Sequence, residues 1–183
     1  MEGLLSLQED DLDMTHEKRN IDVVRIEELY QFHSDEILRL CYLYLKDYQL
    51  AEDALQETFF RVTKSIHQFE GNSSAKTWLI RIAINVCKTV ILSQKNKPVE
   101  FAAEASFLMV KTADEIEQLI DKSIVSQAIM RLDTPYREVI LLHFYQELKL
   151  REIAKITGES ITTVAYRLRQ GKKRLKEYLS SKK

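Results

Sequence analysis

The sequence is short of turn-forming residues and of thiols. Its 183 residues include only 4 Gly, 2 Pro and 2 Cys, and no apolar run approaches the ~20 residues that a membrane-spanning helix needs. Few Gly and Pro disfavour an all-β chain with many tight turns, while apolar residues recur every three to four positions, so we predict an all-α protein. Cys41 and Cys87 are isolated thiols among apolar neighbours. We expect both to be buried and reduced in a cytoplasmic protein.

Known catalytic motifs and metal-ligand clusters are also missing. The 4 Gly, at positions 3, 71, 158 and 171, cannot form a Gly-rich phosphate loop or a dinucleotide-binding turn. The 4 His, at positions 16, 33, 67 and 143, have no Cys or carboxylate at metal-ligand spacing. We therefore expect no enzymatic activity, no cofactor, no metal and no small-molecule substrate.

The net charge of −1 hides an uneven distribution. Residues 1–30 carry 3 basic and 9 acidic side chains, a net charge of −6, and residues 31–125 carry 11 basic and 13 acidic, a net charge of −2. Residues 126–183 carry 13 basic and 6 acidic side chains, a net charge of +7. A basic end on a nearly neutral protein indicates a polyanionic partner for that end, although a solvated basic tail explains the charge alone equally well.

Apolar periodicity predicts two small helical domains. The predicted segments are an acidic flexible leader 1–20, a first unit 21–95, a linker 96–113 and a second unit 114–183. The first unit has helix patterns from Ile26 to Leu45 and from Leu50 to Ile66, and the second has one from Ile116 to Leu132. Thr134-Pro135 then predicts a further helix with Thr134 as its N-cap.

A third pattern in the first unit, from Ala75 to Leu92, is apolar around most of its circumference. Gly71 breaks the chain before it, and Ser73 or Ser74 is placed to cap it. Trp78 leads an apolar stripe, so we expect it to pack in the core. The polar positions form one strip, within about 80° on a helical wheel: Thr77, Arg81, Asn85 and Lys88. Such a helix should be buried on most sides and present this strip outward.

The pattern of residues 150–175 is typical of a helix-turn-helix. The small side chain of Ala154 permits close approach of a second helix. Gly158 follows at the point where the chain must turn, and Gly is the residue that adopts a positive φ there without steric cost. Ser160 is placed to cap the second helix, and Val164 and Leu168 return to the core four residues apart.

The outward face of that second helix is polar and basic. Its members are Thr162, Thr163, Tyr166, Arg167, Arg169, Gln170 and Lys173, with Lys172, Arg174 and Lys176 close by. In a major groove the first turn would meet base edges and the later basic residues would meet phosphates. A helical hairpin with a basic face and no DNA-binding role is the alternative interpretation, but the clustering of Arg and Lys favours DNA binding.

Three segments, in order, resemble the extracytoplasmic-function (ECF) subfamily of RNA polymerase sigma factors. Residues 51–62, Ala-Glu-Asp-Ala-Leu-Gln-Glu-Thr-Phe-Phe-Arg-Val, resemble the family's core-polymerase-binding helix. Residues 69–85 resemble its promoter-melting loop and following helix, and residues 132–175 its second DNA-binding domain. The resemblance covers about residues 22–95 and 114–178. It implies a sigma region 2 type helical bundle over 21–95 and a region 4 type helix-turn-helix domain over 114–183, which direct polymerase to promoters.

The resemblance also implies roles for single residues. Those implied for binding core polymerase are Asp53, Gln56, Glu57 and Phe60, although their pattern alone predicts a solvated acidic face. Those implied for the −10 element are Asn72, Ser73, Ser74, Lys76, Thr77, Arg81, Asn85 and Lys88. Those implied for the −35 element are Ser160, Thr162, Thr163, Tyr166, Arg167, Arg169, Gln170, Lys172 and Lys173. The implied partners are bacterial RNA polymerase core (β′ clamp helices and β flap), promoter DNA and an anti-sigma factor, which in this family is commonly membrane-anchored.

The chain departs from the family pattern at a few positions. Lys149 stands where a Ser or Thr helix cap is usual, which puts ~1 kcal/mol of capping in doubt. Ala165 and Tyr166 stand where a basic and a small polar residue are common in the family, so we expect one DNA contact to differ from the family's. Two alternatives stay open from the sequence. A helix-turn-helix operator-binding regulator explains residues 132–178 alone, and a helical protein-binding adaptor predicts no sequence-specific DNA binding.

Overall fold

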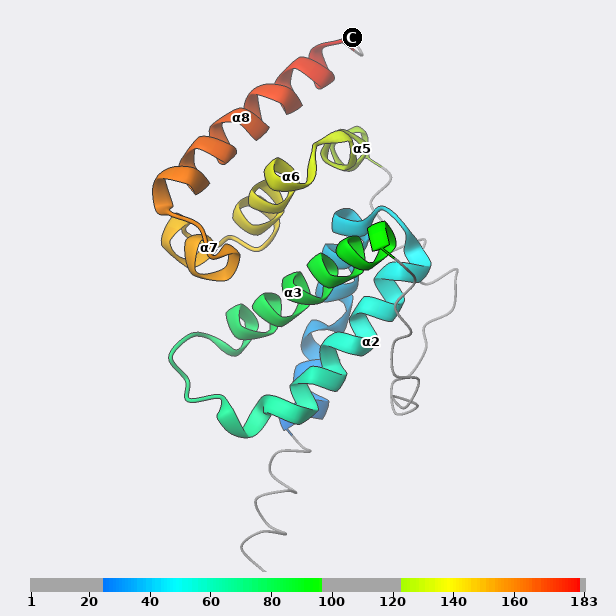
Figure 1. Ribbon diagram of the computed structural model, residues 1–183, viewed down its shortest axis with the longest axis vertical. Helices are drawn as coiled ribbons and strands as arrows, with labels where there is room; N and C mark the ends of the chain where they lie inside the picture. Colours follow the sequence, from blue (N-terminus) through cyan, green and yellow to red (C-terminus); the bar gives the residue numbers. More distant parts are fainter. Residues whose placement is uncertain (1–24, 97–122, 182–183) are drawn as a thin grey trace, which may run out of the picture.

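The computed structural model describes residues 25–96 and 123–181 (Figure 1), so the predicted leader and nearly all of the predicted linker lie outside the described residues. Its first unit consists of a helix over residues 25–45, α2 (Tyr48–Ser65), a 3-10 turn (Ile66–Gln68) and α3 (Ala75–Asn96). Its second consists of α5 (Ile124–Arg131), α6 (Thr134–Ile140), a π-helical turn (Leu141–Tyr145), α7 (Leu150–Thr157) and α8 (Ile161–Ser180). Every regular element in these two ranges is helical, which confirms the all-α prediction.

Local capping explains where the helices of the first unit begin. The Asp47 carboxylate accepts a hydrogen bond from the Leu50 backbone N–H at 2.9 Å, and this fixes the start of α2. The Ser74 hydroxyl accepts the Thr77 N–H at 3.0 Å and so caps α3. Of the two serines considered for that role, Ser74 is therefore the cap.

The core of the first unit forms where α3 packs against α2. Residues of both apolar stripes of α3 are at most 1% exposed: Leu79, Ile80, Ala83, Ile84, Val86, Cys87 and Val90. This confirms that a helix so apolar is buried on most sides. Cys41 and Cys87 are both fully buried, as expected from their neighbours. Burial, with the adjacent Cys41 thiol, raises the pKa of Cys87, so its thiol stays protonated.

In the second unit α8 passes very close to α6. Gly171 is buried in this crossing, and a Cβ built on it would lie 2.9 Å from Ile140 Cγ1. Only a residue without a side chain permits this approach. The core of the unit also includes Val139, Leu141, Leu142, Ile153 and Val164.

Two boundary predictions need correction, and the start of a third helix lies outside the described residues. Thr134 is the first residue of α6 rather than its N-cap; Asp133 holds the cap position, without a side-chain hydrogen bond. Helix α3 continues past Leu92 to Asn96, because no Gly or Pro interrupts it there. The helix predicted from Ile116 to Leu132 begins outside the described residues; within them, α5 starts at Ile124 with Ser123 as its N-cap.

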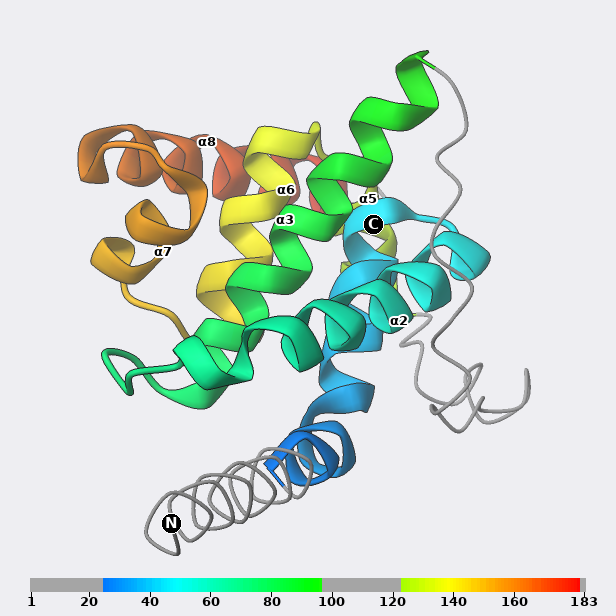
Figure 2. The same ribbon diagram turned by 60° about the horizontal axis from the view of Figure 1, so that its bottom comes forward.

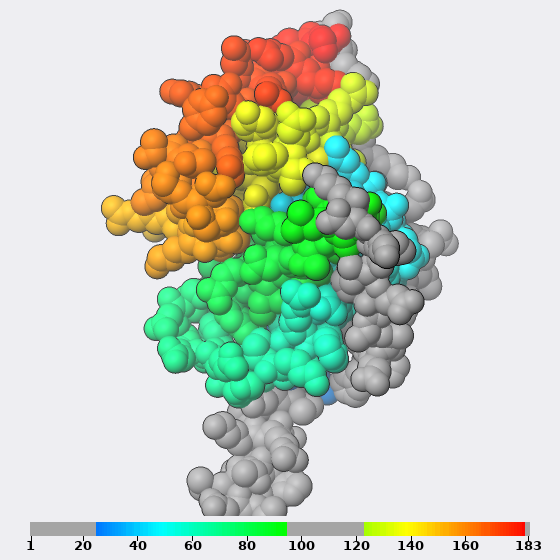
Figure 3. All heavy atoms as spheres, in the orientation of Figure 1, coloured from blue at the N-terminus to red at the C-terminus, as the bar shows by residue number. Residues whose placement is uncertain are grey.

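The two units pack directly against each other. One continuous apolar cluster extends from Ile37 in the first helix to Val164 in α8. Figure 2 shows α3 running alongside α6, and on the face drawn in Figure 3 their atoms abut. Within the described residues no helix is long and apolar enough to cross a membrane, and no cluster of metal-ligating side chains occurs.

Candidate nucleic-acid and protein interfaces

The four residues predicted to bind polymerase share the outer face of α2. Asp53, Gln56, Glu57 and Phe60 are all partly exposed, while the opposite face of the helix is buried. The Glu57 carboxylate accepts a hydrogen bond from Arg61 Nε at 2.7 Å, so its charge is partly neutralised within the helix. This face therefore combines carboxylates with an accessible aromatic ring.

Phe59 and Phe60, adjacent in sequence, have opposite environments. Phe59 is 1% exposed and its ring meets Tyr30 edge-on, with centroids 4.9 Å apart. Phe60 is partly exposed, and the Lys64 ammonium lies 5.1 Å from its ring centroid. The α-helical turn of about 100° per residue accounts for the difference. Phe59 therefore stabilises the fold, and Phe60 is accessible from outside the helix bundle.

The loop before α3 carries the small polar residues predicted to read the −10 element. Gly71 has φ +76°, a left-handed conformation that favours Gly. Asn72 Nδ2 donates a hydrogen bond to Glu70 Oε2 at 2.9 Å, and Ser73 is exposed. The Ser74 and Thr77 hydroxyls are 2.8 Å apart. Asn72 and Ser73 thus stand open at the loop tip, while Ser74 and Thr77 also serve the helix cap.

Trp78 packs inward from the start of α3, as predicted. Its ring lies 5.1 Å from that of Phe69 and rests against the apolar core. The Arg25 guanidinium lies 5.9 Å from the other ring of this pair, that of Phe69. The contact between Phe69 and Trp78 therefore joins the two ends of the loop before α3.

The polar strip of α3 is only partly open to solvent. Arg81 and Asn85 are exposed. Lys76 Nζ instead lies 2.6 Å from a carboxylate oxygen of Glu36 in the first helix. Lys88 Nζ lies 2.8 Å from Glu138 Oε1 in α6. Two of the predicted phosphate contacts are thus occupied by carboxylates of the chain itself.

The helix-turn-helix has the geometry predicted from its sequence. Gly158 ends α7 with φ +74°, and its N–H donates to Ala154 O at 3.0 Å. The Ser160 hydroxyl accepts the Thr163 N–H at 3.1 Å, which caps α8. Val164 is fully buried, and Leu168 packs against the same core.

The start of α7 compensates for its missing cap residue. Lys149 occupies the N-cap, and an ammonium group cannot accept a hydrogen bond from the helix. The Lys149 backbone N–H donates to Glu152 Oε2 at 2.8 Å, so half of a capping box is present.

The outer face of α8 divides into engaged and exposed side chains. Arg167 donates to Glu159 Oε1 at 2.8 Å, and the Arg169 guanidinium lies 5.7 Å from the Tyr166 ring centroid. Tyr166 is itself 50% exposed. The other predicted contacts on this helix are exposed or partly exposed: Thr162, Thr163, Gln170, Lys172 and Lys173. They form a polar and basic surface along one helix.

One nearby basic residue is held by α6. The Arg174 guanidinium stacks 4.2 Å from the Tyr136 ring centroid and pairs with the Asp133 carboxylate. It secures the long helix to its own domain. The charge of Arg174 adds to the positive potential of the outer face of α8, but its side chain is held by Tyr136 and Asp133.

The sequence analysis did not anticipate that two adjacent charged residues of α6 are buried. Arg137 and Glu138 are 3% and 4% exposed. Arg137 donates to Leu132 O at 2.9 Å, and its guanidinium lies 5.9 Å from the ring centroid of Tyr44 in the first unit. Glu138 is paired with Lys88. Nothing in the local pattern signalled this burial, because the covering surface comes from the other unit.

Burial perturbs the titration of these groups. Desolvation raises the pKa of Glu138, partly offset by Lys88 and Arg167, while Glu159 raises it further. Desolvation also lowers the pKa of Arg137, and it raises that of Tyr44 together with the nearby charge of Glu138. The contact between the units is therefore electrostatically costly unless Lys88 stays in place.

Comparison with protein families gives two matches. The Sigma-70 region 2 family matches residues 29–97, and the Sigma-70, region 4 family matches residues 122–175. The region 2 match covers the first unit, which an operator-binding regulator would leave unexplained. Together the two matched regions include the residues predicted to bind polymerase and DNA, in the predicted order.

Full-length relatives agree with these matches. The chain is 32% identical over 165 residues to the ECF RNA polymerase sigma factor SigW of Bacillus subtilis (strain 168), across 83% of this chain and 87% of the relative. It is 28% identical over 163 residues to the RNA polymerase sigma factor YlaC of the same organism, across 85% of this chain and 92% of the relative. Both relatives are RNA polymerase sigma factors.

Solved structures share the fold. A sigma factor RpoE, crystallised with the anti-sigma factor NepR from Bartonella quintana, aligns with a TM-score of 0.62 at 21% identity, over 84% of this chain and 96% of that one. CnrH in complex with the cytosolic domain of CnrY aligns with a TM-score of 0.61 at 19% identity, over 86% and 89%. Two family regions in order, together with relatives similar over most of both lengths, show that the chain belongs to the ECF subfamily of RNA polymerase sigma factors, which direct the polymerase to specific promoters and initiate transcription.

Proposed function

We propose that the outer face of α2 is the main attachment to core polymerase. Phe60 supplies an apolar anchor, and Asp53 and Glu57 surround it with carboxylates suited to a basic partner surface such as the β′ clamp helices, with Gln56 between them. Buried aromatic anchors carry much of the affinity of protein interfaces, and rim charges mainly guide association. The partial exposure of all four side chains supports this assignment. A contact of the second domain with the β flap would complete the attachment.

The loop and polar strip of the first domain would hold the opened −10 element. Extruding a base costs a few kcal/mol, which stacking and hydrogen bonds in a pocket return. Asn72 and Ser73 stand at the exposed loop tip, where they can reach base edges. Arg81, with Lys76 and Lys88 once released from their carboxylates, would meet the backbone phosphates, and Asn85 lies between them on the strip.

The capped start of α8 would enter the major groove of the −35 element. Thr162, Thr163 and Tyr166 would meet base edges, because they lie in the first turns after the Ser160 cap. Arg167, Arg169, Gln170, Lys172 and Lys173 follow along the helix toward phosphates. Tyr166, where a small polar residue is common, would give this chain its own base preference.

The chain would act in the cytoplasm, where core polymerase is found, without catalytic chemistry of its own. Of the two structural relatives described above, RpoE is bound to the anti-sigma factor NepR, and CnrH is bound to the cytosolic domain of CnrY. We extend that kind of partner to this chain, as a protein that covers its polymerase-binding or DNA-binding faces.

The observation that carries the proposal is that each of the three predicted surfaces has exposed or partly exposed polar side chains on one folded chain. Run-off transcription with purified core polymerase on a genomic promoter library tests it. The full chain should direct initiation from a defined set of templates. No initiation from any template, with properly folded protein, would contradict the proposal.

A matched pair of charge reversals tests the α2 face separately. Glu57→Lys should abolish capture of core polymerase in a pull-down. Glu27→Lys makes the same charge change at an exposed position of the first helix outside the predicted face, and should leave capture intact. Equal loss in both variants would refute the assignment of the α2 face.

A further inference from the structure

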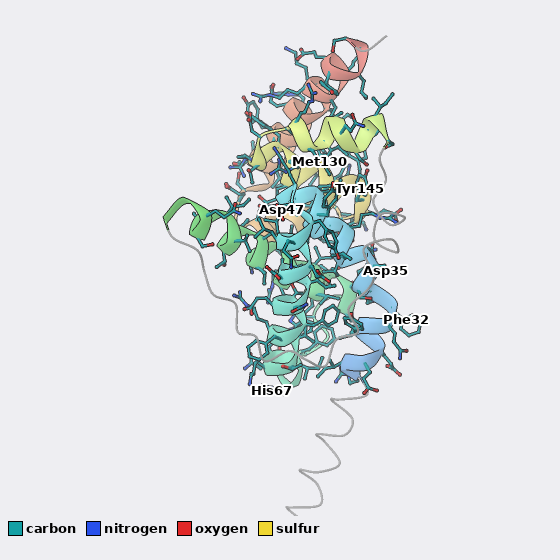
Figure 4. All side chains as sticks on the ribbon, turned by 90° about the vertical axis from the view of Figure 1, so that its right-hand side faces the viewer. Phe32, Asp35, Asp47, His67, Met130 and Tyr145 are labelled. Atoms are coloured by element: carbon teal, nitrogen blue, oxygen red, sulfur yellow. The ribbon has the colours of Figure 1, made fainter. Side chains whose placement is uncertain are left out.

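One line of side chains on α8 points directly away from the core of the second domain. Val164 is fully buried in that core. Since successive residues of a helix are about 100° apart, Tyr166 and Lys173 project from the opposite side, about 160–180° from Val164. Tyr166 is 50% exposed, and Figure 4 shows α8 at the end of the molecule opposite His67, with side chains extending outward from it. Tyr166 therefore presents a large aromatic ring in the second turn of the helix predicted to enter the major groove.

The three arginines of α8 have different partners. Arg167 and Arg174 each pair with a carboxylate of the second domain. Arg169 is exposed, and its guanidinium carbon lies 5.7 Å from the centroid of the Tyr166 ring. A carboxylate occupies guanidinium N–H groups, whereas a contact with an aromatic ring leaves them available for hydrogen bonds. Arg169 is therefore the arginine of α8 that is best placed to donate to an acceptor on DNA.

The contact with Tyr166 also fixes how far along the helix Arg169 acts. By its position in the sequence alone, Arg169 would lie later on the helix, toward phosphates, about 4.5 Å beyond Tyr166 along the axis. Long helical side chains lean toward the N-terminus, however, so side chains three residues apart meet. The guanidinium of Arg169 consequently lies beside the Tyr166 ring, in the part of a recognition helix that contacts base edges.

The major-groove edges of two bases match these two groups. Guanine presents O6 and N7, which accept two hydrogen bonds from one guanidinium, and thymine presents a C5-methyl group that packs against apolar or aromatic side chains. Base pairs follow each other about every 3.4 Å along the duplex. The 5.7 Å between the Arg169 guanidinium and the Tyr166 ring is more than one such step and less than two. The two groups can therefore contact adjacent base pairs at once.

We propose that Tyr166 and Arg169 act together as a reader of two adjacent base pairs in the −35 element. Arg169 donates to O6 and N7 of a guanine, and the Tyr166 ring packs against the methyl group of the neighbouring thymine. This inference rests on the proposed function of α8, and it moves Arg169 from phosphate binding to base recognition. Tyr166 contributes twice, because its ring also holds the Arg169 guanidinium in place. An exposed contact of this kind favours the held position about two- to fivefold.

Selection of −35 sequences by the loaded polymerase tests this pair of residues. Core polymerase carrying the full chain is offered promoter fragments that support run-off transcription, with their −35 elements randomised, and the bound fragments are sequenced. The wild type should enrich a G·C pair beside a T·A pair, and Arg169→Ala should lose the guanine preference. Tyr166→Ser should lose the thymine preference and weaken the guanine preference about two- to fivefold, while Tyr166→Phe, which keeps the ring, should retain both. Lys172→Ala, the control, removes one charge at an exposed position and should weaken binding to all fragments alike.

Modified bases test the same contacts without altering the protein. Deoxyuridine in place of the thymine removes one methyl group and should weaken binding of the wild type about fourfold, with no effect on Tyr166→Ser. 7-Deazaguanine removes N7 and should weaken binding of the wild type about fivefold, with little effect on Arg169→Ala. Thermal denaturation of each variant checks that these substitutions of exposed residues leave the second domain folded.

Equal affinity of the wild type for thymine and deoxyuridine, or a guanine preference that survives in Arg169→Ala, would overturn the inference. If the loaded polymerase enriched no base at any −35 position, the proposed function of α8 would be contradicted as well. Enrichment that is the same in the wild type, Tyr166→Ser and Arg169→Ala would contradict only the paired reader.

Discussion

Two adjacent phenylalanines of α2 allow stability and polymerase binding to be separated. Phe59→Ala removes a ring that is 1% exposed and packed edge-on against Tyr30. Truncating a buried Phe to Ala typically costs about 3–5 kcal/mol, from lost burial and the cavity left behind. Since domains are stable by only about 5–15 kcal/mol, this variant should unfold at much lower urea concentration. Phe60→Ala removes a partly exposed ring whose contact with Lys64 contributes about 0.5 kcal/mol, so its stability should change little.

Binding to core polymerase should reverse this order. If Phe60 is the anchor of the α2 face, its loss should cost about 2 kcal/mol or more of binding free energy, about 30-fold in Kd. Phe59→Ala should bind nearly normally at temperatures where it remains folded. Urea denaturation followed by circular dichroism, with equilibrium binding to core polymerase at 10 °C, measures both quantities. If Phe60→Ala lost as much stability as Phe59→Ala, or bound core polymerase as well as the wild type, the assignment of the two faces would be wrong.

Four further changes have defined outcomes. Ser160→Ala should lower the free energy of unfolding by about 1 kcal/mol in thermal denaturation, because it removes the side-chain cap of α8. Lys173→Ala should weaken binding to all −35 duplexes alike and reduce the slope of log affinity against log salt by about 1, as fluorescence anisotropy at several salt concentrations would show. Gly171→Val should destabilise the second domain by about 1–3 kcal/mol in urea denaturation, because any Cβ there overlaps Ile140. Burial raises the pKa of Glu138, so the folded chain binds this proton more tightly than the unfolded chain does. The contribution of Glu138 to the free energy of unfolding is therefore present at low pH and declines as the pH rises through the folded pKa. Urea denaturation at pH 5 and pH 8 should show that Glu138→Gln removes this decline.

Features set by neighbouring residues could be predicted from the sequence. The turn at Gly158 and the cap at Ser160 depend on a left-handed φ and on a hydroxyl beside a helix start, and both are local requirements. The two apolar stripes of α3 likewise follow from helical spacing. By contrast, the start of α6 was misplaced by one residue, because Asp133 and Thr134 are both acceptable cap residues before Pro135.

Features that depend on distant residues could not be predicted. Arg137 and Glu138 look like a solvated charged pair in the sequence, but they are buried, with Tyr44 and Lys88 of the first unit beside them. Lys76 and Lys88 pair with Glu36 and Glu138, and the sequence carries no sign of these carboxylate partners. Periodicity assigns a side chain to a face, and it does not say what lies opposite that face.

The burial of the two native thiols has a practical consequence. Cys41 and Cys87 are the 2 Cys of the sequence, and neither has measurable exposure in the folded first domain. A maleimide dye offered to the native protein should therefore react only with cysteines introduced on the surface. Donor and acceptor dyes on the two domains would then report their separation in single molecules, as polymerase and promoter are added, without altering either natural thiol.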